Sequence, residues 1–226
     1  MKNLVIIGNG NFARQLNYYI TEYDSRRVAA FSVDSAYITE NRTLVPPGGG
    51  GRVTTLPFES IEKEFPPDSF EVILGIGYSK MNQVRRNLFL RCKQKGYTVA
   101  SFVHPTAVIS KGVQLGEGNI VLEQSVIQPF VRIGKGNLIW HSVKIAHDNA
   151  IGDFNTLCQN TSIAGASCVG DNCFLGNSCT VFGGLSIADY TLAGAGSVIK
   201  KDTKPYEVTV PARSISLNCK KSTDYI

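Results

Sequence analysis

The residues with the clearest chemistry are an adjacent histidine and aspartate, His147 and Asp148, in the segment KIAHDNAIGD. The sequence has three histidines, and the other two are His104 and His141. Imidazole titrates near neutral pH, and a carboxylate on one ring nitrogen fixes the tautomer and makes the other nitrogen more basic. The pair could therefore deprotonate an amine or a hydroxyl. It is also compatible with two exposed polar residues on a structural turn.

Two glycine turns form a second group of candidate residues. The first, GNGNFA at 8–13, satisfies G-x-G-x-x-[GA] after a hydrophobic strand and before a helix, and the second is GIG at 75–77. Backbone N–H groups at such turns bind phosphates. A tight turn without a ligand is the alternative. The nucleotide-binding residues that we expect are Gly8, Asn9, Gly10, Asn11, Asp34, Gly75, Gly77 and Tyr78.

The first hundred residues contain the elements that would position these turns. Strand, turn and helix follow one another at 3–20 and at 70–97, and further strands are expected at 28–34 and 98–103. Strands that alternate with helices indicate a parallel sheet. About 100 residues are enough for one mononucleotide-binding half, but not for the two halves that a dinucleotide cofactor bridges. The stretch 36–56 is expected to be a mobile surface loop.

A six-residue repeat positions the histidine pair. Every sixth residue from Val103 to Ile199 is apolar, which makes seventeen positions, and sixteen of them are Val, Ile or Leu. This period predicts a β-helix whose coils have three flat faces and 18 residues, with the aliphatic residues stacked inside. Positions two residues earlier should be small or slim, which explains Cys173 and Cys179 without a metal. The recurring glycines Gly116, Gly134, Gly152 and Gly170 are expected to relieve tight or positive-φ corners.

Composition excludes several other classes of protein. The 226 residues carry a formal charge of +5 that is spread along the chain, which disfavours a nucleic-acid binder. No apolar run approaches the roughly 20 residues of a membrane span, and the N-terminus lacks the features of a secretory signal. We therefore expect a cytoplasmic protein whose six cysteines are free thiols.

Taken together, the segments KIAHDNAIGD, AGASCVGDNCFLGNSCTV and LAGAGSVIKKDT resemble those of bacterial nucleotide-sugar acyltransferases, such as the bacillosamine-pathway N-acetyltransferases and the sialic acid O-acetyltransferases. The resemblance covers nearly the whole chain. It implies a Rossmann-like α/β domain at 1–100 that binds the nucleotide sugar, a left-handed parallel β-helix at 101–204 that carries the acyltransferase site, and a C-terminal tail at 205–226. It also implies a homotrimer.

The resemblance assigns roles to individual residues. His147 would be the catalytic base, Asp148 would assist it, and the backbone amide of Gly165 would hold the thioester carbonyl of acetyl-CoA. Thr156 stands where a second histidine contacts the cofactor in the bacillosamine enzyme. Ala164, Lys200 and Lys201 complete the expected cofactor contacts, although the two lysines could equally be a solvated end of the β-helix.

The implied reaction is transfer of an acetyl group from acetyl-CoA to the amine of a nucleotide-linked 4-amino-4,6-dideoxy sugar, without a metal. Departures from the family pattern fall around the sugar nucleotide: Asn11 and Phe12 in the first turn, the segment GIGYSKMNQVRR in place of a G-[ND]-N-x-x-R loop, and Thr209 in TVPAR. The alternatives are O-acetylation of a sugar such as sialic acid, a zinc-dependent hydratase and a non-catalytic trimeric scaffold. Zinc would require a third ligand besides His141 and His147.

Overall fold

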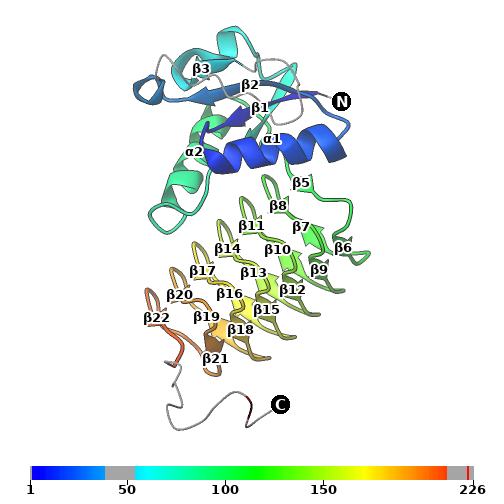
Figure 1. The fold of residues 1–226 in the computed structure, drawn as a ribbon, viewed down its shortest axis with the longest axis vertical. Helices are drawn as coiled ribbons and strands as arrows, with labels where there is room; N and C mark the ends of the chain where they lie inside the picture. The colour runs from blue at the N-terminus through cyan, green and yellow to red at the C-terminus, as the bar shows by residue number, and fades with distance from the viewer. Residues whose placement is uncertain (1, 39–53, 213–222, 224–226) are drawn as a thin grey trace.

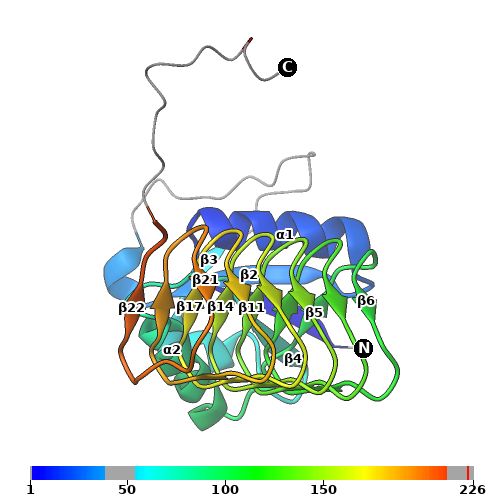
Figure 2. The same cartoon turned by 90° about the horizontal axis from the view of Figure 1, so that it is seen from below.

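The computed structural model describes residues 2–38, 54–212 and 223, and it has an α/β domain packed on a parallel β-helix (Figure 1). This is the predicted fold class. Figure 2 shows the coils following one another from β6 to β22. In the described part of the chain, no helix is both long and apolar enough to cross a membrane.

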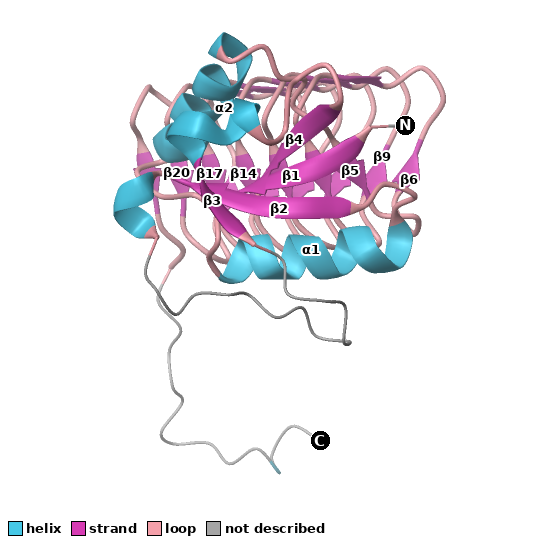
Figure 3. Cartoon of the chain, turned by 90° about the horizontal axis from the view of Figure 1, so that it is seen from above, coloured by secondary structure: helices cyan, strands magenta, loops and turns pink. Residues whose placement is uncertain are grey.

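The α/β domain is built on a four-stranded parallel sheet with the strand order β3-β2-β1-β4. Its strands are β1 (Asn3–Ile7), β2 (Val28–Val33), β3 (Thr55–Pro57) and β4 (Phe70–Leu74). Helix α1 (Asn11–Tyr23) follows β1, and helix α2 (Gln83–Gln94) follows β4 (Figure 3). Two short 3-10 helices, η1 (Ser35–Tyr37) and η2 (Phe58–Lys63), connect the strands.

Alternate residues of β1 point into two different cores. Leu4 and Ile6 pack with α1 and with the first coils of the β-helix, whereas Val5 and Ile7 pack with α2 and η2. This period of two is the property of a strand buried on both faces. The two helices therefore lie against opposite faces of the sheet, and both cores include residues of the β-helix.

Two expectations for this domain were wrong in part. The segment 98–103 does not form another strand of the sheet: Val99 makes one bridge to Val72, and Phe102–Val103 is β5, the first strand of the β-helix. Both ends of the expected loop 36–56 overlap regular elements, η1 (Ser35–Tyr37) at its start and the edge strand β3 (Thr55–Pro57) at its end. Residues 39–53 of that loop lie outside the described residues.

The β-helix consists of three parallel sheets, one for each face. The first sheet contains β7 (Gln114–Leu115), β10 (Arg132–Ile133), β13 (Ala150–Ile151), β16 (Cys168–Val169) and β19 (Ser186–Ile187). The second contains β5 (Phe102–Val103), β8 (Ile120–Val121), β11 (Leu138–Ile139), β14 (Thr156–Leu157), β17 (Phe174–Leu175), β20 (Leu192–Ala193) and β22 (Val208–Thr209). The third contains β6 (Val108–Ile109), β9 (Val126–Ile127), β12 (Lys144–Ile145), β15 (Ser162–Ile163), β18 (Thr180–Val181) and β21 (Val198–Ile199).

The register of these sheets confirms the predicted coil. Leu138 pairs with Thr156, one coil further along the chain, and every face repeats this pattern. From β8 to β21, the second residue of each two-residue strand points inward, and these side chains form one buried cluster against which Ile109 and Leu115 pack. Val103 in β5, which the repeat also placed inside, is 38% exposed. Strand β22 pairs with β20, so the described part of the expected C-terminal tail continues the second sheet beyond residue 204.

Small polar residues two positions before the inward aliphatics join successive coils. The side-chain oxygen of Asn119 accepts from the backbone N–H of Asn137, that of Asn137 accepts from Asn155, and that of Asn155 accepts from Cys173. All four residues are buried. Burial raises the pKa of Cys173 to about 12 and that of Cys179 to about 11, so both thiols are protonated and act as packing groups. The five described cysteines are free.

The recurring glycines have a different physical cause from the one expected. Gly116, Gly134, Gly152 and Gly170 are not among the positive-φ residues. A Cβ on Gly152 would instead lie 2.7 Å from the carbonyl oxygen of Gly170 and would also meet the carboxylate of Asp171. Asp171 occupies that space because its side chain accepts from the N–H of Asp153, 2.7 Å away. The glycines are therefore required by close stacking of successive coils.

Candidate active site and nucleotide pocket

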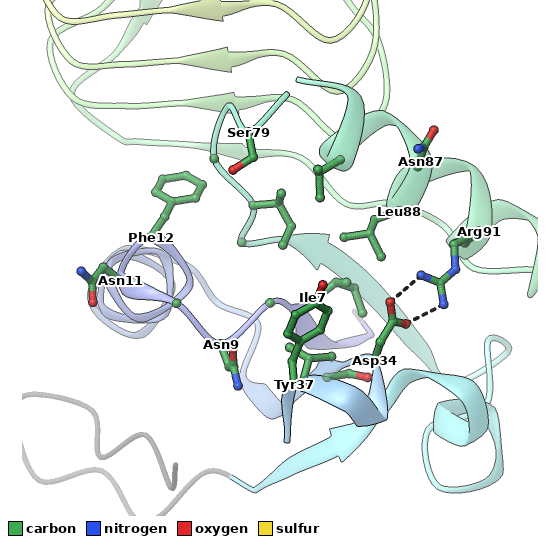
Figure 4. A pocket seen from close by; sticks show the side chains of 18 of the residues that line it. Ile7, Asn9, Asn11, Phe12, Asp34, Tyr37, Ser79, Asn87, Leu88 and Arg91 are labelled. Atoms are coloured by element: carbon green, nitrogen blue, oxygen red, sulfur yellow. Dashed lines mark hydrogen bonds and ion pairs between the residues drawn. The ribbon is translucent and has the colours of Figure 1, made fainter. Parts of the chain in front are cut away.

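The glycine turns open into a cavity of about 840 Å³ at the carboxyl ends of β1 and β4 (Figure 4). In the order β3-β2-β1-β4, β2 and β3 are added on one side of β1 and β4 is added on the other, so the direction of strand addition changes between β1 and β4. Ligands of open parallel sheets bind at such a switch point. Of the expected nucleotide-binding residues, seven line the cavity: Gly8, Asn9, Gly10, Asn11, Asp34, Gly75 and Gly77.

Backbone contact between the two turns explains their glycines. Gly8 has φ +118°, and a Cβ there would lie 2.8 Å from the carbonyl oxygen of Gly75. A Cβ on Gly75 would in turn lie 2.7 Å from the Cα of Ala13 in helix α1. Side chains at either position would separate the strand ends from the helix, so the glycines let the backbone itself line the cavity.

The cavity contains polar groups without a protein partner. The side-chain nitrogen of Asn9 and the hydroxyl of Ser32 are buried and make no hydrogen bond with any described residue. Helix α1 begins at the cavity, and its N-cap, Gly10, provides no side-chain cap. Free N–H groups and the positive end of the helix dipole at this position favour an anionic ligand such as a phosphate.

Asp34 lies on the cavity wall, where Arg91 holds it. Its two carboxylate oxygens accept from the Arg91 guanidinium at 2.6 and 2.9 Å, and the Arg91 guanidinium stacks 4.6 Å from the centre of the Phe58 ring. The hydrogen bonds from Arg91 lower the pKa of Asp34 below its ordinary value. The carboxylate is therefore charged and has a fixed orientation. If Asp34 contacts a nucleotide base or ribose, as expected, it must do so through the carboxylate lone pairs that Arg91 does not use.

Tyr78 is the one expected nucleotide-binding residue that is not part of the cavity wall. Its ring packs instead on Phe174 of the β-helix, with 5.0 Å between ring centres. Tyr78 comes directly after the second glycine turn, at the point where the chain crosses from the α/β domain to the coils. Its position indicates a contact between the domains rather than a contact with the nucleotide.

The His147–Asp148 pair lies at a corner of the β-helix, directly after strand β12. Asp148 has φ 57°, a left-handed conformation that Asp and Asn tolerate better than most residues. At this corner the Oδ2 atom of Asp148 lies 2.8 Å from Nδ1 of His147. With Nδ1–H donating to the carboxylate, Nε2 is left with a free lone pair, as a general base requires. The side chains are 60% and 57% exposed.

Gly165 lies one coil above His147 and leaves space for its ring. A Cβ on Gly165 would lie 2.7 Å from Cε1 and 2.8 Å from Nε2 of the imidazole. The neighbouring amides, those of Ala164 and Ala166, donate to backbone carbonyls, but the N–H of Gly165 has no such partner among the described residues. An unpaired N–H beside Nε2 of the candidate base could serve as an oxyanion-binding donor.

The remaining expected cofactor residues divide into two groups. Ala164 is half-buried beside Gly165, and Lys200 and Lys201 are exposed at the far end of the β-helix. Thr156 is in a different environment: it is fully buried, its hydroxyl donates to Asn82, and it accepts from Arg85. Its side chain is therefore covered by the α/β domain and is not open to a cofactor.

Sequence reasoning did not identify Arg85 and Arg91 of helix α2 as site residues. Arg91 lines the cavity, and Arg85 is a fully buried guanidinium. The sequence spacing could have identified Arg85. It follows the i, i+4, i+7 pattern of one helix face together with Phe89 and Cys92, and these three are the buried residues of α2. A cation on the apolar face of a helix indicates a buried polar network.

The chain thus combines a cavity at the switch point of a parallel sheet with a β-helix that carries an exposed His–Asp pair at one corner. No protein-family model matches the sequence, and no curated protein matches it. Solved structures do match. The acetyltransferase domain of PglB from Neisseria gonorrhoeae FA1090 is 18% identical with a TM-score of 0.79, over 93% of this chain and 97% of its own.

Two further solved structures have the same architecture. PerB from Caulobacter crescentus, solved in complex with CoA and GDP-perosamine, is 25% identical with a TM-score of 0.78, over 93% of this chain and 95% of its own. WeeI from Acinetobacter baumannii AYE is 18% identical with a TM-score of 0.70, over 93% of this chain and 97% of its own. These matches confirm the architecture that the sequence resemblance predicted.

Proposed function

We propose that the protein is an acetyl-CoA-dependent N-acetyltransferase that acts on the amine of a nucleotide-linked 4-amino-4,6-dideoxy sugar. The observation that carries this proposal is the His147–Asp148 pair, with the free N–H of Gly165 above the imidazole. The similarity to PerB, whose structure contains both CoA and GDP-perosamine, supports the choice of the two substrates. The cavity beside Asn9, Ser32 and the start of α1 would hold the nucleotide.

The proposed reaction needs no covalent enzyme intermediate. Nε2 of His147 takes a proton from the amine as the nitrogen attacks the thioester carbonyl. The Gly165 N–H donates to the oxyanion that forms, and comparable donors contribute roughly 3–4 kcal/mol to the transition state. When the intermediate collapses, the carbon–sulfur bond breaks and the proton on His147 passes to the CoA thiolate. Asp148 keeps the imidazole in the reactive tautomer and stabilises its protonated form.

A column of residues above His147 provides a path for CoA. Gly165, Gly183 and Lys201 follow His147 at intervals of one coil, and in the neighbouring column Lys200 lies 5.6 Å above the Phe182 ring. Coils are spaced by roughly 4.8 Å, so Lys201 lies on the order of 14 Å from His147 along the helix axis. The pantetheine arm would lie over the two glycines, and the two lysines would meet the CoA phosphates.

An acetylation screen tests the proposal. Purified protein is incubated with acetyl-CoA and with UDP-, dTDP- and GDP-linked amino sugars or free sialic acid, and released CoA thiol and acetylated product are measured. The expected result is turnover on at least one nucleotide-linked amino sugar. Turnover on sialic acid alone would overturn the amine assignment and favour the O-acetyltransferase. Turnover on none, with His147→Ala indistinguishable from wild type in acetyl-CoA hydrolysis, would favour the scaffold.

A further inference from the structure

Arg85 is a buried cation that donates to four backbone carbonyls and to the Thr156 hydroxyl. Its Nη1 donates to the carbonyl of Gly77 at 2.7 Å, and its Nε donates to the carbonyl of Gly136 at 2.8 Å. Its Nη2 lies 2.9 Å from the Asn155 carbonyl and 3.2 Å from the Phe154 carbonyl. No described carboxylate forms an ion pair with it. Burial lowers its pKa to about 9, which still leaves the guanidinium charged at neutral pH.

These contacts join the two halves of the proposed site. Gly77 belongs to the second glycine turn and lines the nucleotide cavity. Phe154 and Asn155 belong to the coil that begins at the His147 corner and lie at its next corner, between β13 and β14. One planar guanidinium thus holds the edge of the cavity and the coil of the candidate base, and its fork of N–H donors fixes direction as well as distance.

The segment before α2 makes a second link between the same parts. Lys80, Met81 and Asn82 have φ values of 51°, 49° and 65°, three consecutive left-handed residues without a glycine. Such a conformation persists only where surrounding contacts hold it. The buried Asn82 provides them: its Nδ2 donates to the Cys173 carbonyl at 3.0 Å, and its Oδ1 accepts from the Thr156 hydroxyl at 2.7 Å.

We propose that Arg85 and Asn82, linked through Thr156, are positioning residues that set the placement of the nucleotide cavity on the coils carrying His147 and Gly165. The proposal rests on the proposed function. Because the sugar amine is covalently tied to the nucleotide, a shift of the cavity against the coils would move the amine away from the base. Neither residue touches substrate. They act by holding one binding part against the other.

The mildest test is Thr156→Val, which keeps the shape of the side chain but removes the hydroxyl between Asn82 and Arg85. Its matched control is Thr161→Val. Thr161 is also fully buried, and its hydroxyl donates within the β-helix, to the Gly176 carbonyl at 3.2 Å. Each variant loses the hydrogen bonds of one buried β-helix hydroxyl: those of Thr156 go to Asn82 and Arg85, whereas that of Thr161 goes to the Gly176 carbonyl of the β-helix. Only the first loses a link to the α/β domain.

Three measurements separate positioning from binding and from catalysis. Nucleotide affinity is followed by fluorescence of Trp140, the only tryptophan, whose ring lies 5.4 Å from that of the cavity residue Phe12. The kcat is measured with the nucleotide-linked amino sugar and with a free amino sugar, which does not use the cavity. For Thr156→Val we expect nucleotide affinity and free-sugar turnover within about twofold of wild type, and kcat on the nucleotide sugar at least about tenfold lower.

Each other pattern would overturn the proposal. Equal loss of kcat on both acceptors would place the effect at His147. A weaker nucleotide affinity with unchanged kcat would make the network part of the nucleotide site. Equal effects of Thr156→Val and Thr161→Val would mean that the substitution at Thr156 only lowers stability. Arg85→Lys keeps the positive charge but loses the planar set of N–H donors of the guanidinium. It should therefore show the same selective loss in kcat. An unchanged kcat in Arg85→Lys would show that the guanidinium hydrogen bonds do not position the two parts.

A readout without substrate distinguishes failure of this proposal from failure of the proposed function. In Thr156→Val, the backbone amides of Asn82, Gln83 and Arg86, which close the left-handed turn and start α2, should exchange hydrogen at least about tenfold faster than in Thr161→Val. If wild-type protein acetylates no sugar but this difference is seen, the proposed activity is wrong and the coupling of the two parts stands. If the exchange rates are equal, the coupling is wrong whatever the activity.

Discussion

At the scale of single residues, the His147–Asp148 corner should dominate turnover. His147→Ala should lower kcat by about 10²–10⁴, the usual contribution of a general base, with little change in KM for acetyl-CoA. Asp148→Asn should cost less, because the amide keeps a hydrogen bond to Nδ1 but loses the charge. Steady-state kinetics on the sugar identified in the screen would measure both effects.

His141→Ala is the control for this prediction. His141 follows β11 and His147 follows β12, so they occupy equivalent corners of neighbouring faces rather than one site. We expect the His141 variant to keep a kcat close to wild type. An inactive His141→Ala together with an active His147→Ala would place the base one face earlier.

The space between Gly165 and the imidazole gives a second residue-scale prediction. In Gly165→Ala the new methyl would meet Cε1 and Nε2 of His147, so the ring must turn away and kcat should fall by at least about tenfold. The double variant His147→Ala with Gly165→Ala has room for the methyl. Thermal unfolding of the four proteins should therefore show that the two changes are not additive. Additive melting temperatures would mean that ring and methyl do not compete for space.

The pair Asp34–Arg91 gives a pH-dependent prediction. The lowered pKa of Asp34 means that its ionised form stabilises the fold; this contribution is present above its unfolded pKa, near 3.8, and is lost as pH falls through the lower folded value. Arg91→Met should therefore reduce the free energy of unfolding at pH 7, and the difference from wild type should vanish below that range. Urea unfolding at several pH values measures this difference, with the exposed Arg132→Met as control. A difference that persists at pH 2 would assign the effect to the Phe58 contact.

At the scale of elements, the closeness of successive coils makes glycine a structural requirement. In Gly152→Ala the added methyl would lie 2.7 Å from the Gly170 carbonyl, and we expect a loss of about 1–3 kcal/mol in the free energy of unfolding, as for other overpacked sites. The control is Gly77→Ala, where a Cβ would meet no atom within 4 Å. Equal stability of the two variants in denaturant unfolding would show that the coils can separate at little cost.

At the scale of the whole molecule, the His147–Asp148 corner is open to solvent in the described part of the chain. His147 and Asp148 are more than half exposed, and Phe130, which lies one coil below Asp148 at the same corner, is 70% exposed. Phe182, at the same edge, is 47% exposed. Exposed apolar side chains around the candidate catalytic pair favour burial by another copy of the chain.

The sequence resemblance implies a homotrimer, and we expect its proposed active sites to lie between adjacent β-helices, where these side chains would be covered. Light scattering coupled to size exclusion should give a mass three times the 24.6 kDa of the chain. Phe130→Asp should weaken assembly and activity together, because the charge would be buried in the contact. A stable monomer that is fully active would contradict the shared site.

The sequence by itself determined the period of the β-helix, the two glycine turns and the His147–Asp148 pair. These features are local: an inward residue recurs every six positions, and a turn or a corner needs particular residue types over a few neighbours. The inward aliphatics from Val121 to Ile199 are all buried, and seven of the eight expected nucleotide-binding residues line the cavity. The resemblance supplied Gly165, which a repeat pattern could not single out.

Only the tertiary structure decided how the two domains meet. Thr156 and Tyr78 were assigned to ligands, but the docking of α2 and its preceding turn covers Thr156, and Tyr78 packs on Phe174. The role of Arg85 depends on carbonyls 51 and 69 residues away along the chain. The glycines of the coils were expected from backbone conformation, but they are set by a neighbour one coil away. Contacts between residues distant in sequence produce no regular spacing along the chain. The packing of the two domains therefore could not be predicted from the sequence.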